Sequence, residues 1–223
     1  MKLNEEIRHV LAGLAVPEAI RRTIAEAMQE VDRNQVAPGL AVGDSAPDFT
    51  LPNPYNQQVA LRDKLARGPV VLSFFRGDWC PVCNLQLRAL QRALPDIRNA
   101  GASLVTVTPQ SLMHALSLTE KAALEFDVLT DLDQRVMRAY RVQFALPEKV
   151  KDIYLGVLAL DLGEQNADGS WNLPVPATFI IDRQGIIRTR HVTADFTRRM
   201  EPDDVLQALA LLSPRATPRV AAG

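Results

Sequence analysis

The sequence predicts an α/β fold, because short apolar segments of strand character alternate with segments of helical periodicity. The clearest strand is Val70–Phe75, an apolar run bounded by glycine and proline. Leu104–Thr108 and Val128–Asp131 are two further strands, and helical patterns follow both. Near the end of the chain, Thr178–Ile181 and Ile186–His191 are separated by a tight turn, which predicts an antiparallel hairpin. We therefore expect a central mixed sheet flanked by helices.

Length and charge limit the possible classes of function. A chain of 223 residues with 47% hydrophobic composition is enough for one full α/β core and an extension. The net charge is −1 without a basic block, which argues against nucleic acid or an anionic membrane as a main partner. No apolar run approaches membrane-spanning length, and the start, MKLNEEIRHV, has early acids and no signal-peptide core. We expect a cytoplasmic protein.

Residues 1–36 are predicted to form a helical extension of two amphipathic helices. Apolar residues recur at helical spacing over Leu3–Leu14 and again over Ile20–Val31, and Pro17 opens the second helix. Each helix has one apolar stripe that another surface must cover. Two alternatives are open, since the stripes can pack on the main domain or form a contact in a homodimer.

The main domain is predicted over residues 44–213, after a connector rich in glycine and proline. It begins with a short hairpin that ends near residues 59–61, followed by a helical turn and the central strand. The next helix runs to Asn99, and Gly101 ends it. Ser117–Glu120 fits a capping box, so we expect another helix to start there and to end near Phe126.

The second half contains a short helix over Gln134–Tyr140 and a last helix over Met200–Leu212. Residues 147–172 are predicted to hold a helix and a polar loop. This segment either frames the mouth of the functional site or is a surface excursion. Residues 214–223 form a polar tail that contains proline, and we expect it to be flexible.

The only two cysteines, Cys80 and Cys83, lie where the central strand ends and a helix begins. The first turn of a helix has unpaired N–H groups and the positive end of the dipole, so a thiolate there is stabilised. Pro81 suits the first helical position, which makes Cys80 the predicted N-cap and the more exposed sulfur. We therefore expect Cys80 to attack and Cys83 to resolve.

Two charged neighbours precede the dithiol. Arg76 is placed to hold the negative charge of the thiolate, whereas Asp78 opposes it unless it accepts a proton through water. A static disulfide is the weaker interpretation, because structural disulfides occur mainly in exported proteins. A zinc site needs four ligands, and the three histidines have no ligand spacing relative to the cysteine pair, so we expect no metal.

Four segments together resemble the AhpC/TSA peroxiredoxin superfamily, which has a thioredoxin fold. They are GDSAPDFTLP, WCPVC after its strand, EFDVLTDLDQRVMRAYRV and PATFIIDRQGIIR. The resemblance covers residues 44–212 and is greatest to a bacterial peroxiredoxin-like group with a WCxxC centre. It implies a thioredoxin-like fold and reduction of hydroperoxides through a cysteine sulfenic acid. It also implies recycling by thioredoxin or a similar dithiol, and no cofactor.

The chain departs from the motif of this family, Pro-x-x-x-Thr-x-x-Cys. Aligned by spacing, Arg76 takes the proline position, Cys80 the threonine position and Cys83 the position of the peroxidatic cysteine. The family's activating arginine is absent, and Val175-Pro176 occupies that region. The glutamate that follows the peroxidatic cysteine is replaced by Gln86.

These departures resemble thioredoxins. Trp79 begins the thioredoxin dithiol pattern Trp-Cys-x-x-Cys, and we expect its ring to pack over the helix start. Val175-Pro176 stands where thioredoxins keep a cis-proline facing the dithiol, so a cis bond is expected here. Arg198 and Arg199 either face the site or lie on the solvated surface, and we expect the solvated surface.

Three functions follow from the dithiol. The first is a thiol-dependent peroxidase with hydroperoxide substrates, which contributes to antioxidant defence and cell redox homeostasis. The second is a thiol–disulfide oxidoreductase that acts on protein or small-molecule disulfides. The third is a non-enzymatic interaction module in which the dithiol is a sensor. Fold alone does not decide among them.

Overall fold

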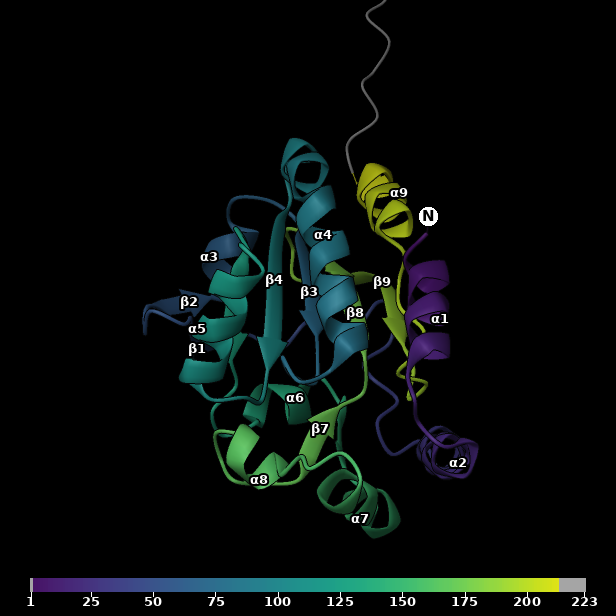
Figure 1. Ribbon diagram of the computed structural model, residues 1–223. Coiled ribbons are helices and arrows are strands. Elements are labelled where there is room, and N and C mark those ends of the chain that lie inside the picture. The colour runs from purple at the N-terminus through teal and green to yellow at the C-terminus, as the bar shows by residue number, and fades with distance from the viewer. Residues whose placement is uncertain (1, 213–223) are drawn as a thin grey trace, which may run out of the picture.

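The computed structural model describes residues 2–212 and has a five-stranded mixed sheet at its centre (Figure 1). The strands, in their order across the sheet, are β5 (Asp127–Thr130), β4 (Ser103–Thr108), β3 (Val70–Phe74), β8 (Ala177–Ile181) and β9 (Ile187–Val192). The first three are parallel to one another, and β8 and β9 form the predicted antiparallel hairpin. The α/β class is confirmed.

Both faces of the sheet are covered by helices, as a central strand buried along its whole length requires. One face carries α4 (Pro81–Asn99), with α1 (Leu3–Gly13) and α9 (Pro202–Leu212) packed against it, and α5 (Leu112–Lys121). The core on the opposite side contains residues of α2 (Glu18–Arg33), α3 (Leu61–Leu65), α6 (Arg135–Ala139), α7 (Glu148–Gly156) and α8 (Leu162–Gln165), and α7 and α8 lie beyond the end of the sheet (Figure 1). Figure 1 shows α4 in front of the sheet with α1 and α9 beside it.

The predicted N-terminal helices are present, and their stripes pack on the main domain. Leu3 and Ile7 of α1 are buried in the α4 face, whereas Met28 and Val31 of α2 are buried in the core of the other face. The break before Pro17 allows the chain to cross from one face to the other. A homodimer contact stays a prediction.

Two short antiparallel pairs lie outside the central sheet. The predicted hairpin is formed by β1 (Thr50–Pro52) and β2 (Gln58–Ala60). The second pair, β6 (Gln143–Ala145) with β7 (Asn172–Pro174), encloses α7 and α8, and the sequence did not predict it. Residues 147–172 are therefore a tethered insertion that contains two helices.

The predicted start of the helix at Ser117 is wrong. The helix α5 begins at Leu112, because the Ser111 hydroxyl accepts the N–H of His114 at 3.5 Å and caps it. Ser117 lies inside this helix, which ends at Lys121. None of the helices between residues 2 and 212 combines the length and apolar character that crossing a bilayer requires. The predicted tail at 214–223 lies outside the described residues.

Candidate redox-active dithiol site

The two cysteines lie at the junction of β3 and α4, as predicted. Cys80 is the N-cap of α4, with Pro81 at its first position, and the Cys80 Sγ accepts the N–H of Cys83 at 3.3 Å. Both thiols are reduced. The prediction of an exposed Cys80 is wrong, since both sulfurs are fully buried beneath neighbouring side chains.

Arg76 lies against Cys80. Its Nη2 donates to the Cys80 Sγ at 3.0 Å and its Nη1 donates to the Tyr154 hydroxyl of α7 at 3.2 Å. The guanidinium carbon stacks on two rings, 4.4 Å from the centroid of Phe196 and 5.2 Å from that of Trp79. Burial would lower the pKa of Arg76, but the nearby thiols and Tyr154 raise it instead. Arg76 is therefore a permanent cation beside the sulfur.

Arg199 lies on the other side of the pair. Its Nη2 is 3.7 Å from the Cys83 Sγ, and its Nε donates to the Gln86 side chain at 2.7 Å. Only 3% of Arg199 is exposed, so the prediction of a solvated side chain is wrong for this residue, while its neighbour Arg198 is exposed. The backbone of Arg199 is held by Asn4 of α1 through two hydrogen bonds, which turns the side chain inward.

The two thiols ionise as a pair because they share a hydrogen bond. Burial raises the pKa of Cys80, and its hydrogen bond to Cys83 adds to this effect. Burial also opposes ionisation of Cys83, but the hydrogen bond from Cys80 and the charges of Arg199 and Arg76 hold the pKa of Cys83 well below its usual range. The two guanidiniums and the hydrogen bond between the thiols thus favour ionisation of one thiol of the pair, that of Cys83.

The Asp78 carboxylate interacts with residues other than the two cysteines. Its carboxylate accepts the Gln110 amide N–H at 2.6 Å and lies 3.5 Å from the His114 ring. The indole of Trp79 packs edge-on against the Tyr154 ring of α7. Gly77 has a positive φ, and a Cβ at this position would collide with the side chains of Trp79 and Gln110. These contacts fix the loop that precedes α4.

Val175 and Pro176 lie at the correct end of the sheet, but the predicted cis bond is wrong. The register pairs Ala177 with Phe74, so Val175-Pro176 is at the edge where β3 leads to the dithiol. The Val175–Pro176 bond is trans. Val175 donates its N–H to Val142 and Pro176 accepts from Thr193, so the chain continues extended from β7 into β8.

Sequence reasoning missed three contributors to the site. Tyr154 stood in an apolar run of uncertain structure, Arg199 in a charged segment, and Phe196 beside it. None had a local signal, because each reaches the dithiol only through packing of distant elements. Within residues 2–212, no three side chains among His, Cys, Asp and Glu gather in the manner of metal ligands.

A profile described as the AhpC/TSA family matches residues 42–190. The chain is 24% identical over 176 residues to the thiol-disulfide oxidoreductase ResA of Geobacillus thermodenitrificans, covering 78% of this chain and 80% of the relative. It is 24% identical over 182 residues to the chloroplastic peroxiredoxin Q of Oryza sativa subsp. japonica, covering 81% and 71%. The crystal structure of peroxidoxin BcpB from Mycobacterium tuberculosis superposes with a TM-score of 0.62 at 19% identity, covering 78% of this chain and 99% of that chain. The predicted thioredoxin-like fold is confirmed.

Proposed function

The chain belongs to the AhpC/TSA family and is an oxidoreductase, and from this premise we propose that it is a thiol-dependent peroxidase. Its substrate is a hydroperoxide, and its reactive groups are Cys80 and Cys83. One observation carries the proposal. The buried dithiol lies between two guanidiniums, with Arg76 at 3.0 Å from Cys80 and Arg199 at 3.7 Å from Cys83. Nearby cations favour the thiolate over the thiol, and the thiolate is the nucleophilic form.

We assign the attack to Cys80 because the cation beside it, Arg76, faces a cavity. The cation beside Cys83, Arg199, does not. Arg76 lines the large cavity beside the site, whereas Arg199 is not among the residues that line it. In this assignment the Cys80 proton passes to Cys83 along the hydrogen bond between the thiols before the attack, which places the negative charge on Cys80. The N–H of Cys83 and the guanidinium of Arg76 then stabilise the charge on Cys80.

The reaction transfers two electrons from the dithiol to the peroxide. The Cys80 thiolate attacks the terminal peroxide oxygen, the S–O bond forms and the O–O bond breaks. The leaving alkoxide or hydroxide takes the proton of the Cys83 thiol and departs as an alcohol or as water. The Cys83 thiolate then attacks the sulfur of the Cys80 sulfenic acid, the S–S bond forms, and hydroxide leaves and is protonated by solvent. An external dithiol such as thioredoxin restores both thiols by exchange.

Arg199 compensates for the activating arginine that is missing from its usual place in the sequence. It comes from the segment after β9 and reaches the dithiol from the opposite side to Arg76. Cys80, at the position of the family's threonine, accepts hydrogen bonds from Arg76 and from the helix N-terminus. The proposed role extends to antioxidant defence and redox homeostasis in the cytoplasm.

The second candidate is a thiol–disulfide oxidoreductase. It is supported by the Trp-Cys-x-x-Cys pattern and by the similarity to ResA. In that case the Cys80 thiolate attacks a substrate disulfide and forms a mixed disulfide, and Cys83 then releases the reduced substrate. The cations beside the dithiol would support attack on a peroxide as well as attack on a disulfide. The relative rates of these two reactions therefore distinguish the two functions.

A rapid-mixing experiment on the fully reduced protein separates the two functions. Trp79 adjoins Cys80, so its fluorescence should report oxidation of the pair, and Trp171→Phe removes the other tryptophan signal. Oxidation by an organic or inorganic hydroperoxide far faster than that of a free thiol at the same pH is the expected result. Slow reaction with every hydroperoxide, together with fast exchange with a disulfide, would replace the peroxidase by the oxidoreductase.

A further inference from the structure

The amide of Gln86, in α4, joins the dithiol site to a row of buried polar side chains. Its Oε1 accepts the Nε–H of Arg199 at 2.7 Å, and its Nε2 donates to the Ser73 hydroxyl at 3.1 Å. Ser73 lies in β3 and shares a hydrogen bond of 3.0 Å with the hydroxyl of Thr178, its partner in β8. Each of these four residues is at most 3% exposed. The row therefore links the centre of the sheet to the guanidinium beside Cys83.

The Arg199 side chain donates only to neutral oxygens and to sulfur within residues 2–212. Its Nη1 donates to the carbonyls of Phe196 and Arg198, and its Nη2 lies 3.7 Å from the Cys83 Sγ. None of the ion pairs between residues 2 and 212 involves Arg199 or Arg76. Of the groups to which the Arg199 side chain donates in this part of the chain, only the Cys83 thiol can become an anion.

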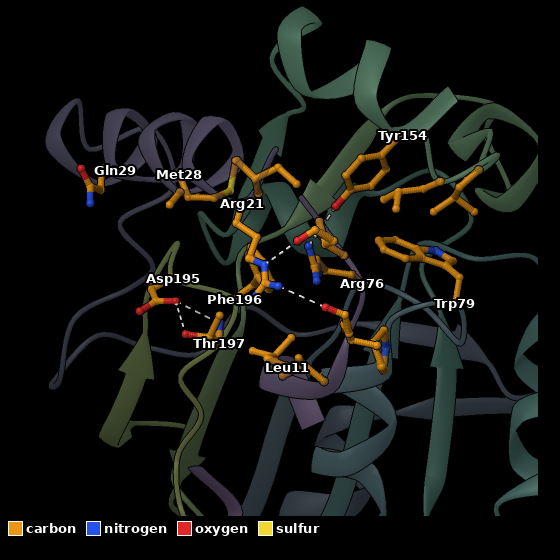
Figure 2. Close-up of a pocket in the computed structure, with 18 of the residues that line it drawn as sticks. Leu11, Arg21, Met28, Gln29, Arg76, Trp79, Tyr154, Asp195, Phe196 and Thr197 are labelled. Carbon is orange, nitrogen blue, oxygen red and sulfur yellow. Dashed lines mark hydrogen bonds between the residues drawn. The ribbon is translucent and has the colours of Figure 1, made fainter. Parts of the chain in front are cut away.

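The neighbouring titratable groups provide Arg199 with no other anion. On the side of Arg76, Figure 2 shows that guanidinium among Trp79, Tyr154 and Phe196. Burial raises the pKa of Tyr154, so its hydroxyl is neutral at neutral pH.

On the side of Arg199, the nearby groups come from β9 and from the residue before α9. Burial and the charges of Arg199 and Arg198 lower the pKa of His191, so its ring is neutral at neutral pH. The Glu201 carboxylate accepts two backbone N–H groups at the start of α1, at 2.8 and 2.9 Å. The positive charge of Arg199 is thus directed to the thiols.

We propose that Gln86 is a positioning residue that aims the Arg199 guanidinium at Cys83 and, as a neutral acceptor, leaves its positive charge to the dithiol. The family motif has a glutamate at this place, and a carboxylate here would form an ion pair with Arg199. The inference rests on the proposed role of Cys80 and Cys83 as the reactive groups. It holds whether the substrate is a hydroperoxide or a disulfide.

The same arrangement favours the reduced dithiol over its disulfide. Burial lowers the pKa of Arg199, and the nearby thiols counteract this effect. When the disulfide forms, the site loses its thiolate, and Arg199 and Arg76 are left buried without an anion. A buried charge without a partner is costly, so formation of the disulfide is opposed.

The test is Gln86→Glu, which keeps the shape of the side chain and adds a negative charge beside the Arg199 Nε. The first pKa of the dithiol, measured by thiolate absorbance, should rise by about 1 to 3 because the carboxylate offsets the charge of Arg199. Gln91→Glu is the matched control. Gln91 lies about two turns beyond Cys83 on the same helix, where its side chain accepts the N–H of Glu125 at 2.9 Å. Identical titrations of these two variants would overturn the proposal.

The equilibrium with glutathione gives a second readout that involves no hydroperoxide. In this exchange the disulfide of oxidised glutathione breaks, the Cys80–Cys83 bond forms, and two reduced glutathione molecules leave with the two thiol protons. Gln86→Glu should shift this equilibrium at least tenfold toward the protein disulfide at neutral pH. The carboxylate destabilises the thiolate and also gives Arg199 a partner in the disulfide form. An unchanged equilibrium would contradict the proposal.

Gln86→Met separates the aim of Arg199 from its charge. Methionine removes the acceptor of the Arg199 Nε–H and the donor to Ser73 but adds no charge. The first pKa should therefore rise, and by less than in Gln86→Glu. No rise would overturn the positioning role, and a rise equal to that of Gln86→Glu would overturn the importance of a neutral acceptor.

The double variant shows whether the effect passes through Arg199. In the Arg199→Met background, Gln86→Glu should hardly change the first pKa, because a buried carboxyl without its cation keeps its proton. An equally large rise there would overturn the route through Arg199. The expected titrations in a protein that reduces no hydroperoxide would retain the role of Gln86 and refute the peroxidase alone.

Discussion

Replacing Arg199 by methionine should raise the first pKa of the dithiol. The guanidinium is buried with its Nη2 at 3.7 Å from the Cys83 Sγ, and it favours the thiolate over the thiol. Methionine keeps an apolar side chain of similar reach but removes the charge. Arg76 remains beside Cys80, so the variant loses only one of the two cations that stabilise the thiolate.

The expected size follows from the distance. Two unit charges 3.7 Å apart interact by about 4 kcal/mol at an effective dielectric constant of about 20. One pKa unit corresponds to about 1.4 kcal/mol, so the complete loss of this interaction would raise the pKa by about 3. Partial relaxation of Arg76 toward the pair reduces the effect, and we expect an increase of about 1 to 3.

The assay is the pH dependence of thiolate absorbance and of alkylation by iodoacetamide. In the native protein the thiolate should persist at pH values well below those at which an ordinary thiol ionises. It should disappear as the pH falls through the lowered pKa of Cys83. Arg198→Met is the matched control, since this neighbour is exposed. If circular dichroism shows that both variants are folded and their titrations are identical, the role of Arg199 is refuted. Arg199→Lys should restore part of the effect because it restores the charge.

Other predictions address the remaining groups of the site. Cys83→Ser should retain one oxidation event, trapped as a sulfenic acid on Cys80, and a sulfenic acid found only on Cys83 in Cys80→Ser would reverse the assigned roles. Arg76→Met should raise the first pKa of the pair and slow peroxide oxidation at least tenfold, whereas an unchanged thiol titration would remove Arg76 from this role. Burial opposes ionisation of Glu201, but the N–H groups of Asn4 and Leu3 at the start of α1 hold the pKa of this carboxyl below its usual range. The contribution of Glu201 to stability is therefore present above about pH 4.3 and lost as the pH falls through the lowered folded-state pKa. Glu201→Gln should abolish this pH dependence in hydrogen exchange of α1, and an unaltered profile would contradict the tether.

The local features of the site could be predicted from the sequence because they depend on short stretches of chain. Pro81 fixes the first turn of α4, so Cys80 falls at the N-cap and Cys83 one turn further along. Arg76 lies in the same loop and reaches Cys80 within a few residues. Such contacts follow from backbone geometry whatever the rest of the protein does.

The distant contributors could not be predicted in this way. Arg199 is separated from Cys83 by 116 residues, and its backbone is held where Asn4 and Glu201 join α1 to the start of α9. Tyr154 reaches Arg76 because the β6–β7 pair anchors the insertion that carries it. A charged or apolar residue in such a segment has the same local pattern whether it faces solvent or a buried thiol.

The N-terminal extension contributes to both sides of the dithiol because its two helices lie on opposite faces of the sheet. On one face, Asn4 of α1 holds the backbone of Arg199, and on the other, Ala25 of α2 lines the cavity that Arg76 also lines. If these contributions are independent, Asn4→Ala should raise the first pKa of the pair without altering the ratio of the oxidation rates with a bulky organic hydroperoxide and with hydrogen peroxide. Ala25→Phe should do the reverse. The Arg21 side chain of α2 donates to the carbonyls of Val16 and Leu14 at the end of α1, so the two helices are also joined to each other. A single variant that changed both properties would mean that the extension docks as one unit, and the assignment of separate roles to α1 and α2 would fail.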